Sequence, residues 1–311
     1  MRLLLIGCTG FIGRELVPQL LNSGHHITLV SRKNAQNFNQ EFSSDQLVIL
    51  QLNPADTNSW QSEELVNALS QAEGVINLAG EPIAEKRWTT AHCQTLKSSR
   101  INTTNGLVNA MSKLRRAPRV FINASAIGFY GTSADEHFTE ESPSGKDLLA
   151  NLCRKWEEKA MEKPRSTRLT IFRIGIVLGP NGGALGKMLP VFKAGLGGPI
   201  GDGNQWMSWI HRADFCQMIQ QALTNKSWAG IINAVAPEPV RMNNFAADLG
   251  RNLGRPSLLP VPGAIIKLLL GDGARVVLEG QHVSSNRLQN LGYKFQYPEL
   301  KQALSNILNP N

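Results

Sequence analysis

The sequence predicts an α/β protein built on a doubly wound parallel sheet, with a smaller α/β region towards the carboxyl terminus. The chain opens with an apolar run, Leu3 to Ile6, that leads directly into three glycines spaced three apart. Apolar strands and amphipathic helices then alternate over the first 175 residues, as in parallel sheets whose strands are joined by helices. Beyond that point, Gly- and Pro-rich stretches interrupt the alternation, which is typical of loops that build a pocket.

The first strand, turn and helix predict a dinucleotide site. Gly7 ends the strand, Gly10 leaves room for a ligand, and Gly13 opens a helix with Leu16 and Leu20 on one face. Such a turn lets the backbone approach a pyrophosphate and directs helix N–H groups at it. A glycine-rich turn without a ligand is the alternative. The residues expected to contact the cofactor here are Gly7, Thr9, Gly10, Phe11, Ile12 and Gly13.

The second strand indicates which dinucleotide is bound. An apolar run at 27–31 follows a helix stop at Ser23-Gly24, and it ends in Ser31-Arg32 with no carboxylate nearby. At this position an acidic side chain usually selects a free ribose 2′-hydroxyl, whereas an arginine accommodates a 2′-phosphate. Ser31 and Arg32 are therefore expected to bind NADP(H) rather than NAD(H). A solvated loop charge is the alternative interpretation of Arg32.

The remaining elements follow from hydrophobic periodicity and turn residues. Strands are expected at 47–52, 74–79, 120–125 and 169–174, and helices at 62–69, 95–114 and 148–161. Residues 1–175, with about 206–235, are expected to form an NADP(H)-binding Rossmann domain. Residues 176–205 and 236–311 should form a smaller substrate or lid region, with an extended connector at 256–262.

Composition excludes several classes of protein. The chain has 311 residues, 42% of them hydrophobic, and a net charge of +8, but its basic residues are scattered. No nucleic-acid partner is indicated, and the positive charge suits an anionic ligand. No apolar run is long enough for a membrane span. The four cysteines lack CxxC spacing and the six histidines are dispersed, which predicts reduced thiols, a cytoplasmic protein and no metal site.

Four motifs resemble the extended short-chain dehydrogenase/reductase family. They are GCTGFIG at 7–13, NLAG at 77–80, NASAIGFYG at 123–131 and FRIGIVLGP at 172–180. The segments at 183–211 and 277–300 further resemble a sugar-nucleotide-epimerase-like subgroup with an extra carboxyl-terminal domain of unknown function, beginning here at about residue 256. Some members of that subgroup are described as cell division inhibitors. The resemblance implies additional cofactor contacts from Leu78, Ala79, Gly80, Arg100, Ala124, Arg173 and Gly175.

The resemblance also implies a catalytic serine and a Tyr-x-x-x-Lys pair on the helix after the fifth strand. Ser125 matches the serine, but Cys153 and Glu157 are expected in the positions of the tyrosine and the lysine. A carboxylate there raises the pKa of a neighbouring acid, whereas a lysine would lower it. The only literal match, Tyr297 to Lys301, lies in the wrong structural context and is interpreted as coincidence.

Other candidates lie in the loops that follow the strands. Tyr130 is expected to face the substrate or to pack as a loop aromatic. Three residues of a glycine-bounded loop, Gln205, Trp206 and Ser208, are substrate-side candidates, with lid packing as the alternative. His211 is either an acid or base or, with more weight, a structural histidine.

Two functions remain open on the sequence alone. One is an NADP(H)-dependent epimerase/dehydratase-like or oxidoreductase-like enzyme with an altered proton relay, acting on an unknown small molecule such as a nucleotide-sugar or another anionic metabolite. The other is a non-catalytic nucleotide-binding regulator, such as a cell division inhibitor that acts through a protein partner. Of the catalytic candidates Ser125, Tyr130, Cys153 and Glu157, the pair of Cys153 and Glu157 separates the two hypotheses, because it argues against ordinary proton transfer. The glycine turn, Ser125 and the lid argue for a bound small molecule.

Overall fold

The computed structural model describes residues 1–32 and 45–309. Its centre is a parallel sheet in the order β11-β7-β5-β4-β1-β2-β3. The strand order reverses between β1 and β4, so the carboxyl ends of these two strands border the crevice where such sheets bind ligands. The strands are β1 (Arg2–Ile6), β2 (His26–Ser31), β3 (Leu47–Gln51), β4 (Gly74–Asn77), β5 (Val120–Ala126), β7 (Arg168–Ile174) and β11 (Gly230–Ala234).

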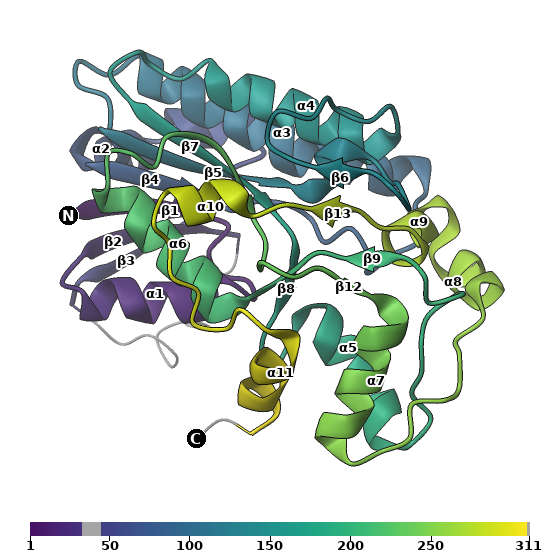
Figure 1. Cartoon of the computed structure of the whole chain (residues 1–311). Coiled ribbons are helices and arrows are strands. Elements are labelled where there is room, and N and C mark those ends of the chain that lie inside the picture. The colour runs from purple at the N-terminus through teal and green to yellow at the C-terminus, as the bar shows by residue number, and fades with distance from the viewer. Residues whose placement is uncertain (33–44, 310–311) are drawn as a thin grey trace.

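Helices cover both faces of this sheet (Figure 1). On one face lie α2 (Glu63–Gln71), α3 (Thr90–Ser112) and α4 (Leu148–Met161); on the other lie α1 (Gly13–Asn22) and α6 (Arg212–Thr224). Strand β1 shows why both faces are covered, because Leu3 and Leu5 pack into one core and Leu4 and Ile6 into the other. An apolar run with no polar alternation is the pattern of a strand buried on both sides.

The predicted fold class is confirmed, with small differences at element ends. Helix α3 begins at Thr90, five residues before the expected start, because Thr89 accepts a hydrogen bond from the His92 amide and caps it. Helix α4 has the expected bounds and is capped by Asp147, whose Oδ1 accepts from the Ala150 amide at 2.9 Å. Strand β11 extends the sheet beyond the six strands expected individually.

The smaller region consists of short helices and three two-stranded pairs. The pairs are β8 (Ile176–Leu178) with β10 (Trp209–His211), β9 (Trp206–Met207) with β12 (Val240–Arg241), and β6 (His137–Phe138) with β13 (His282–Val283). Its helices are α5 (Gly183–Lys193), α7 (Met242–Leu253), α8 (Gly263–Leu270), α9 (Arg275–Leu278), α10 (Asn286–Asn290) and α11 (Leu300–Leu308). Of the short 3-10 helices, η4 (Gly271–Ala274) lies in this region between α8 and α9, whereas η2 (Thr57–Gln61) and η3 (Ile127–Tyr130) lie between elements of the central sheet.

The extended connector expected at 256–262 is neither helix nor strand, and a single bridge joins Val261 to Ile200.

Within residues 1–32 and 45–309, no helix combines the length and the apolar character that crossing a membrane requires.

Candidate functional site

The glycines of the first turn serve two different purposes. Gly7 has φ +75°, and a Cβ there would lie 2.7 Å from the carbonyl carbon of Leu78. A Cβ at Gly13 would overlap the carbonyl oxygen of Cys8. The fold itself therefore needs these two glycines. At Gly10, by contrast, the nearest atom to an added Cβ is 4.0 Å away, so the space above this residue is free for a ligand.

The other residues of the turn hold it against the second half of the chain. The Phe11 ring lies beneath the Arg212 guanidinium, with 4.6 Å between the guanidinium carbon and the ring centroid. Arg212 also donates to the carbonyl of Phe11 and forms an ion pair with Glu15 on α1. Thr9 and Ile12 are half-buried. These contacts keep the turn and the start of α1 in one position.

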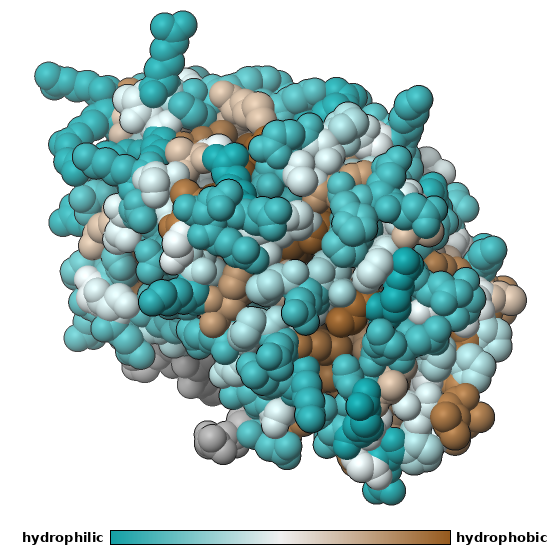
Figure 2. Space-filling view, viewed as in Figure 1, coloured by the Kyte–Doolittle hydropathy of each residue, from teal (hydrophilic) through white to brown (hydrophobic). Residues whose placement is uncertain are grey.

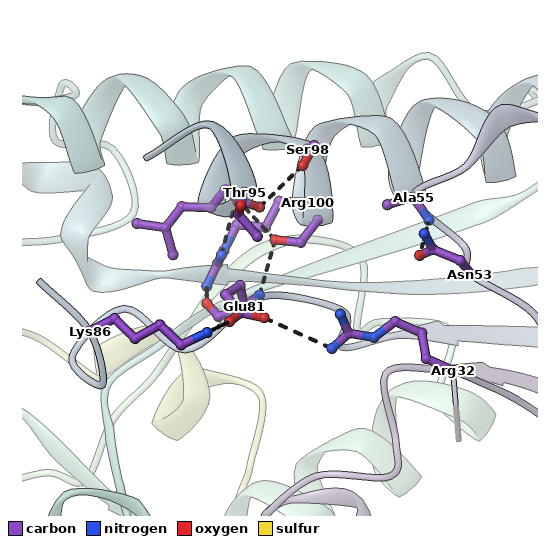
Figure 3. A network of polar contacts seen from close by, with 10 residues as sticks. Arg32, Asn53, Ala55, Glu81, Lys86, Thr95, Ser98 and Arg100 are labelled. Atoms are coloured by element: carbon purple, nitrogen blue, oxygen red, sulfur yellow. Dashed lines mark hydrogen bonds and ion pairs between the residues drawn. The ribbon is translucent and has the colours of Figure 1, made fainter. Parts of the chain in front are cut away.

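Two cations and one carboxylate lie where the second strand ends (Figure 3). The Arg32 guanidinium is 3.9 Å from the Glu81 carboxylate, and Lys86 Nζ is 3.3 Å from the other oxygen of the same carboxylate. The side chains of Arg32 and Lys86 are 68% and 66% exposed, whereas that of Glu81 is 14% exposed. Ser31 is buried, and its carbonyl accepts from the Leu52 amide. Both cations can therefore turn towards an anion outside the protein.

The loop after β4 is fastened to α3. The Glu81 amide donates to Ser99 Oγ at 3.0 Å, and Arg100 Nη2 donates to the Glu81 carbonyl at 3.0 Å. Arg100 also lies over the Trp156 ring, and a Cβ on Gly80 would be 2.8 Å from its guanidinium carbon. Arg100 therefore positions the loop that carries Leu78, Ala79 and Gly80.

The expected catalytic side chains form a buried network below the sheet edge. Glu157 accepts from Ser125 Oγ at 2.6 Å and from the Nε and Nη2 of Arg173 at 2.9 and 2.8 Å. Arg173 Nη1 donates to Tyr130 Oη at 3.0 Å, and that hydroxyl donates to Asn233 at 2.6 Å. Glu157 and Arg173 are each 2% exposed. The guanidinium of Arg173 is thus committed to protein partners, as are the polar atoms of Ser125 and Tyr130.

Burial makes two of these groups weak acids. It raises the pKa of the Tyr130 hydroxyl to about 12, although Arg173 acts in the opposite direction. It likewise raises the pKa of the Cys153 thiol to about 12, and the Glu157 carboxylate adds a smaller effect of the same sign. The sequence predicted the direction for Cys153 but assigned it to the carboxylate, whereas desolvation is the larger cause. Both groups are protonated at neutral pH.

Two residues expected to contact the cofactor, Ala124 and Gly175, lie close to this network and against neighbouring backbone segments. Ala124 lies inside β5 opposite Phe172 of β7 and is buried. A Cβ on Gly175 would overlap the carbonyl oxygen of Ser208. Gly175 therefore lets the chain after β7 pass close to the segment that carries the substrate-side candidates.

The substrate-side candidates contact the carboxyl-terminal part of the chain. Gln205 Nε2 donates to the carbonyls of Ile200 and Val277, and Ser208 Oγ donates to the Gln281 carbonyl. Trp206 Nε1 donates to the Ala134 carbonyl. These contacts favour the lid-packing interpretation of the loop.

His211 caps α6 and faces the tail. Its Nδ1 accepts from the Ala213 amide at 3.1 Å, and its ring lies 4.0 Å from the Tyr297 ring, centroid to centroid. Burial lowers its pKa to about 4, with a further contribution from Arg212. A neutral, capping imidazole agrees with the structural interpretation of this residue. The same contact places Tyr297, the tyrosine of the literal Tyr-x-x-x-Lys match, beside His211.

A cavity of about 770 Å³ lies between the start of α4 and the carboxyl-terminal segment. Its lining combines apolar residues with charged ones, and most of it follows residue 260. The lining residues are Trp88, Thr132, Asp147, Leu148, Leu149, Lys267, Gly271, Asp272, Ala274, Arg275, Val276, Leu278 and Glu279. This volume is within the usual range for small-molecule sites.

The sequence predicted a substrate or lid region at 236–311, which holds most of this lining, but none of the lining residues was expected individually. Leu149 lies one turn before Cys153, so α4 presents a leucine to the cavity while the cysteine is 4% exposed. The sequence did contain a signal for two of these residues. Leu148 and Leu149 form an apolar pair in the first turn of a largely polar helix, and neither belongs to the buried face of α4. Residues far apart in sequence, such as Trp88 and Arg275, gave no such signal.

Comparison with known proteins gives two family matches. Residues 3–234 match the model described as "NAD dependent epimerase/dehydratase family". Residues 261–307 match a second model, described as "Domain of unknown function (DUF1731)". The second match covers α8 to α11, which include most of the cavity lining.

Three similar proteins span nearly the whole chain. An Arabidopsis thaliana protein, "Epimerase family protein SDR39U1 homolog, chloroplastic", is 43% identical over 304 residues, which are 97% of this chain and 85% of that protein. A crystal structure of human epimerase family protein SDR39U1 with NADPH is 36% identical, covers 99% of both chains and has a TM-score of 0.87. UDP-glucuronic acid 4-epimerase from Bacillus cereus, solved with UDP-glucuronic acid and NAD, is 19% identical over 99% and 98% of the two chains, with a TM-score of 0.78; this last likeness concerns the fold alone.

Proposed function

Because the chain belongs to the NAD dependent epimerase/dehydratase family, we propose that it binds NADPH at the carboxyl ends of β1 and β4 and is an oxidoreductase for a small molecule. The pyrophosphate fits the free space above Gly10, next to the start of α1. The 2′-phosphate fits Arg32, with Lys86 as a second cation. A human relative of 36% identity was crystallised with NADPH, which supports the same cofactor here.

One observation carries the catalytic part of the proposal: α4 presents Leu149 to the cavity, four residues before the buried Cys153. If the tyrosine of a Tyr-x-x-x-Lys pair faces the cavity, Leu149 stands in its position and Cys153 stands in the position of the lysine. This assignment lies one helical turn before the one expected from sequence, which was Cys153 and Glu157. Neither side chain can relay a proton, because leucine has no acidic hydrogen and the pKa of the thiol is about 12. We therefore infer that the usual relay is absent.

Without that relay, the polar residues near the strand ends and the cavity serve to position other groups. NADPH supplies a hydride when it is bound. Arg173 and Glu157 hold Ser125 and Tyr130 in fixed positions at the ends of the central strands. In the cavity, Thr132 is a hydroxyl that donates to Glu279 at 2.7 Å. Because the proton of this hydroxyl is directed at the Glu279 carboxylate, a proton needed by the product is proposed to come from water.

The activity test is NADPH consumption across a substrate panel. We expect negligible turnover of UDP- and GDP-sugars by the wild-type protein, because the cavity has no tyrosine relay. Cys153→Ala should retain whatever turnover other carbonyl compounds show, within about twofold, since the thiol is buried and protonated. Robust sugar-nucleotide turnover that disappears in Cys153→Ala would make the cysteine the acid and contradict the proposal.

Cofactor choice is tested at Arg32. We expect Arg32→Ala to weaken NADPH binding about tenfold and NADH binding hardly at all, because a hydrogen bond between charged groups contributes about 1.5 to 3 kcal/mol and this side chain is largely exposed. Glu81→Gln is the matched variant: removing a negative charge beside the phosphate should tighten NADPH binding. Titrations that followed protein fluorescence and gave equal losses for both cofactors in Arg32→Ala would place the 2′-phosphate elsewhere.

A nucleotide-binding regulator with a protein partner, such as a cell division protein, is the second candidate. The observation in its favour is the apolar surface of α8, where Ile265, Leu268 and Leu269 are 48%, 73% and 62% exposed. Figure 2 shows hydrophobic residues on the surface at this edge of the molecule. A protein that binds NADPH but turns over no carbonyl compound would favour the regulator.

For either function, we infer a cytoplasmic location from the free cysteines among the described residues.

A further inference from the structure

We propose that the segment 263–279, within the domain of unknown function, is the recognition wall of the cavity, and that its ligand is an apolar compound with a single carboxylate rather than a nucleoside diphosphate sugar. The inference rests on the proposed NADPH-dependent function and names the class of its substrate. It is carried by the attachment of this wall, the balance of charge in the lining and the apolar surface beside it.

The wall is attached to the loop that carries the cofactor residues. Arg87 Nη1 donates to the Leu268 carbonyl at 2.6 Å, and the Trp88 amide donates to the Leu270 carbonyl at 3.1 Å. A Cβ on Gly273 would lie 2.6 Å from Trp88 Cδ1, so only glycine lets η4 pack on this ring. The wall and the cofactor loop therefore form one edge of the cavity.

The opposite end of the wall is attached to the loop after β5. Thr132 donates to Glu279, and the Ser133 amide donates to the Gly280 carbonyl at 3.1 Å. The segment thus spans the cavity between two loops that follow central strands. Substrates of nicotinamide enzymes must lie near those strand ends, so a wall fixed there contacts the substrate directly.

Charge in the lining argues against a nucleoside diphosphate. The cavity has two cations, Lys267 and Arg275, and three carboxylates, Asp147, Asp272 and Glu279. Arg275 is paired with Glu279 at 2.9 Å. Lys267 is exposed and acts on the Glu279 carboxylate without forming an ion pair with it, so it is the cation left for a ligand in the described part of the chain. One lysine among three carboxylates can hold one negative charge, whereas a diphosphate brings at least two.

The rest of the lining favours an apolar body. Trp88, Leu148, Leu149, Val276 and Leu278 contribute hydrophobic surface. The indole N–H of Trp88 already donates to the Ile83 carbonyl at 2.8 Å, and Gly273 packs against the same ring, so Trp88 offers the cavity apolar ring surface rather than a hydrogen-bond donor. An aromatic or aliphatic body with a carboxylate at one end matches this surface and Lys267 together.

The test is direct binding of 4-phenylbutanoate, 4-phenylbutan-1-ol and UDP-glucose to the full chain, with and without saturating NADPH, by calorimetry. We expect the carboxylate to bind more tightly than UDP-glucose. Lys267→Met should weaken the carboxylate about fivefold and leave the neutral alcohol and NADPH unchanged, as expected for one charged contact from an exposed lysine. Lys301→Met, an exposed change on α11 outside the cavity, should alter none of the three.

Three outcomes overturn the inference: tighter binding of UDP-glucose, no binding of 4-phenylbutanoate, or an equal loss for acid and alcohol in Lys267→Met. Failure to bind NADPH, with the ligand order intact, would instead refute the proposed function and leave the wall as a site for apolar carboxylates. The two failures are therefore distinguishable in one set of titrations.

Discussion

Gly10→Val is expected to abolish NADPH binding, with at least a 100-fold loss of affinity, while the protein stays folded. The nearest atom to an added Cβ at this position is 4.0 Å away, so the branch point of the new side chain does not clash with the turn. It occupies the space that the pyrophosphate needs for close approach to the backbone. Fluorescence titration with NADPH measures the affinity, and thermal unfolding without cofactor verifies the fold.

Gly186→Val is the matched control for that change. Gly186 lies inside α5, and an added Cβ there also has its nearest neighbour at 4.0 Å. We expect this variant to bind NADPH like the wild type. Gly13→Val would be a poor choice, since its side chain would overlap the Cys8 carbonyl and unfold the turn. NADPH affinity retained by Gly10→Val would show that the turn is not the cofactor site.

The fold was predictable because its signals are local. Apolar runs such as Leu3 to Ile6, the glycines of the first turn and the amphipathic α1 each report on a few neighbouring residues. A strand buried on both faces has no polar alternation, and this pattern distinguishes a parallel sheet from an antiparallel one. The cap that starts α3 at Thr90 was missed, because Thr89 follows a loop whose course the pattern does not define.

The candidate site was predictable only in part, because its chemistry depends on contacts between distant residues. Ser125 and Glu157 are 32 positions apart and share a hydrogen bond. Glu81 lies beside Arg32 only because the loop after β4 is fastened to α3. The charge beside a proposed phosphate site and the lining of the cavity are therefore properties of the folded chain. Periodicity and motif spacing do not contain them.

The largest expected loss of stability comes from Arg173→Met. Arg173 and Glu157 are both 2% exposed and share two hydrogen bonds. Removing one partner leaves a buried carboxylate without its counter-charge, which costs about 3 to 5 kcal/mol. We expect urea unfolding to show a decrease of this size in the free energy of unfolding. The double variant Arg173→Met/Glu157→Leu should recover part of the loss, because both charges are then gone.

An exposed pair on the same helix provides the control and connects stability with function. Arg154 and Glu158 on α4 form an ion pair at 2.6 Å, but their side chains are 42% and 53% exposed. Arg154→Met should therefore change the free energy of unfolding by about 0.5 kcal/mol or less. An Arg173→Met protein as stable as Arg154→Met would contradict this difference between a buried and an exposed pair. It would mean that the pair of Arg173 and Glu157 is not what holds Ser125 and Tyr130 in place.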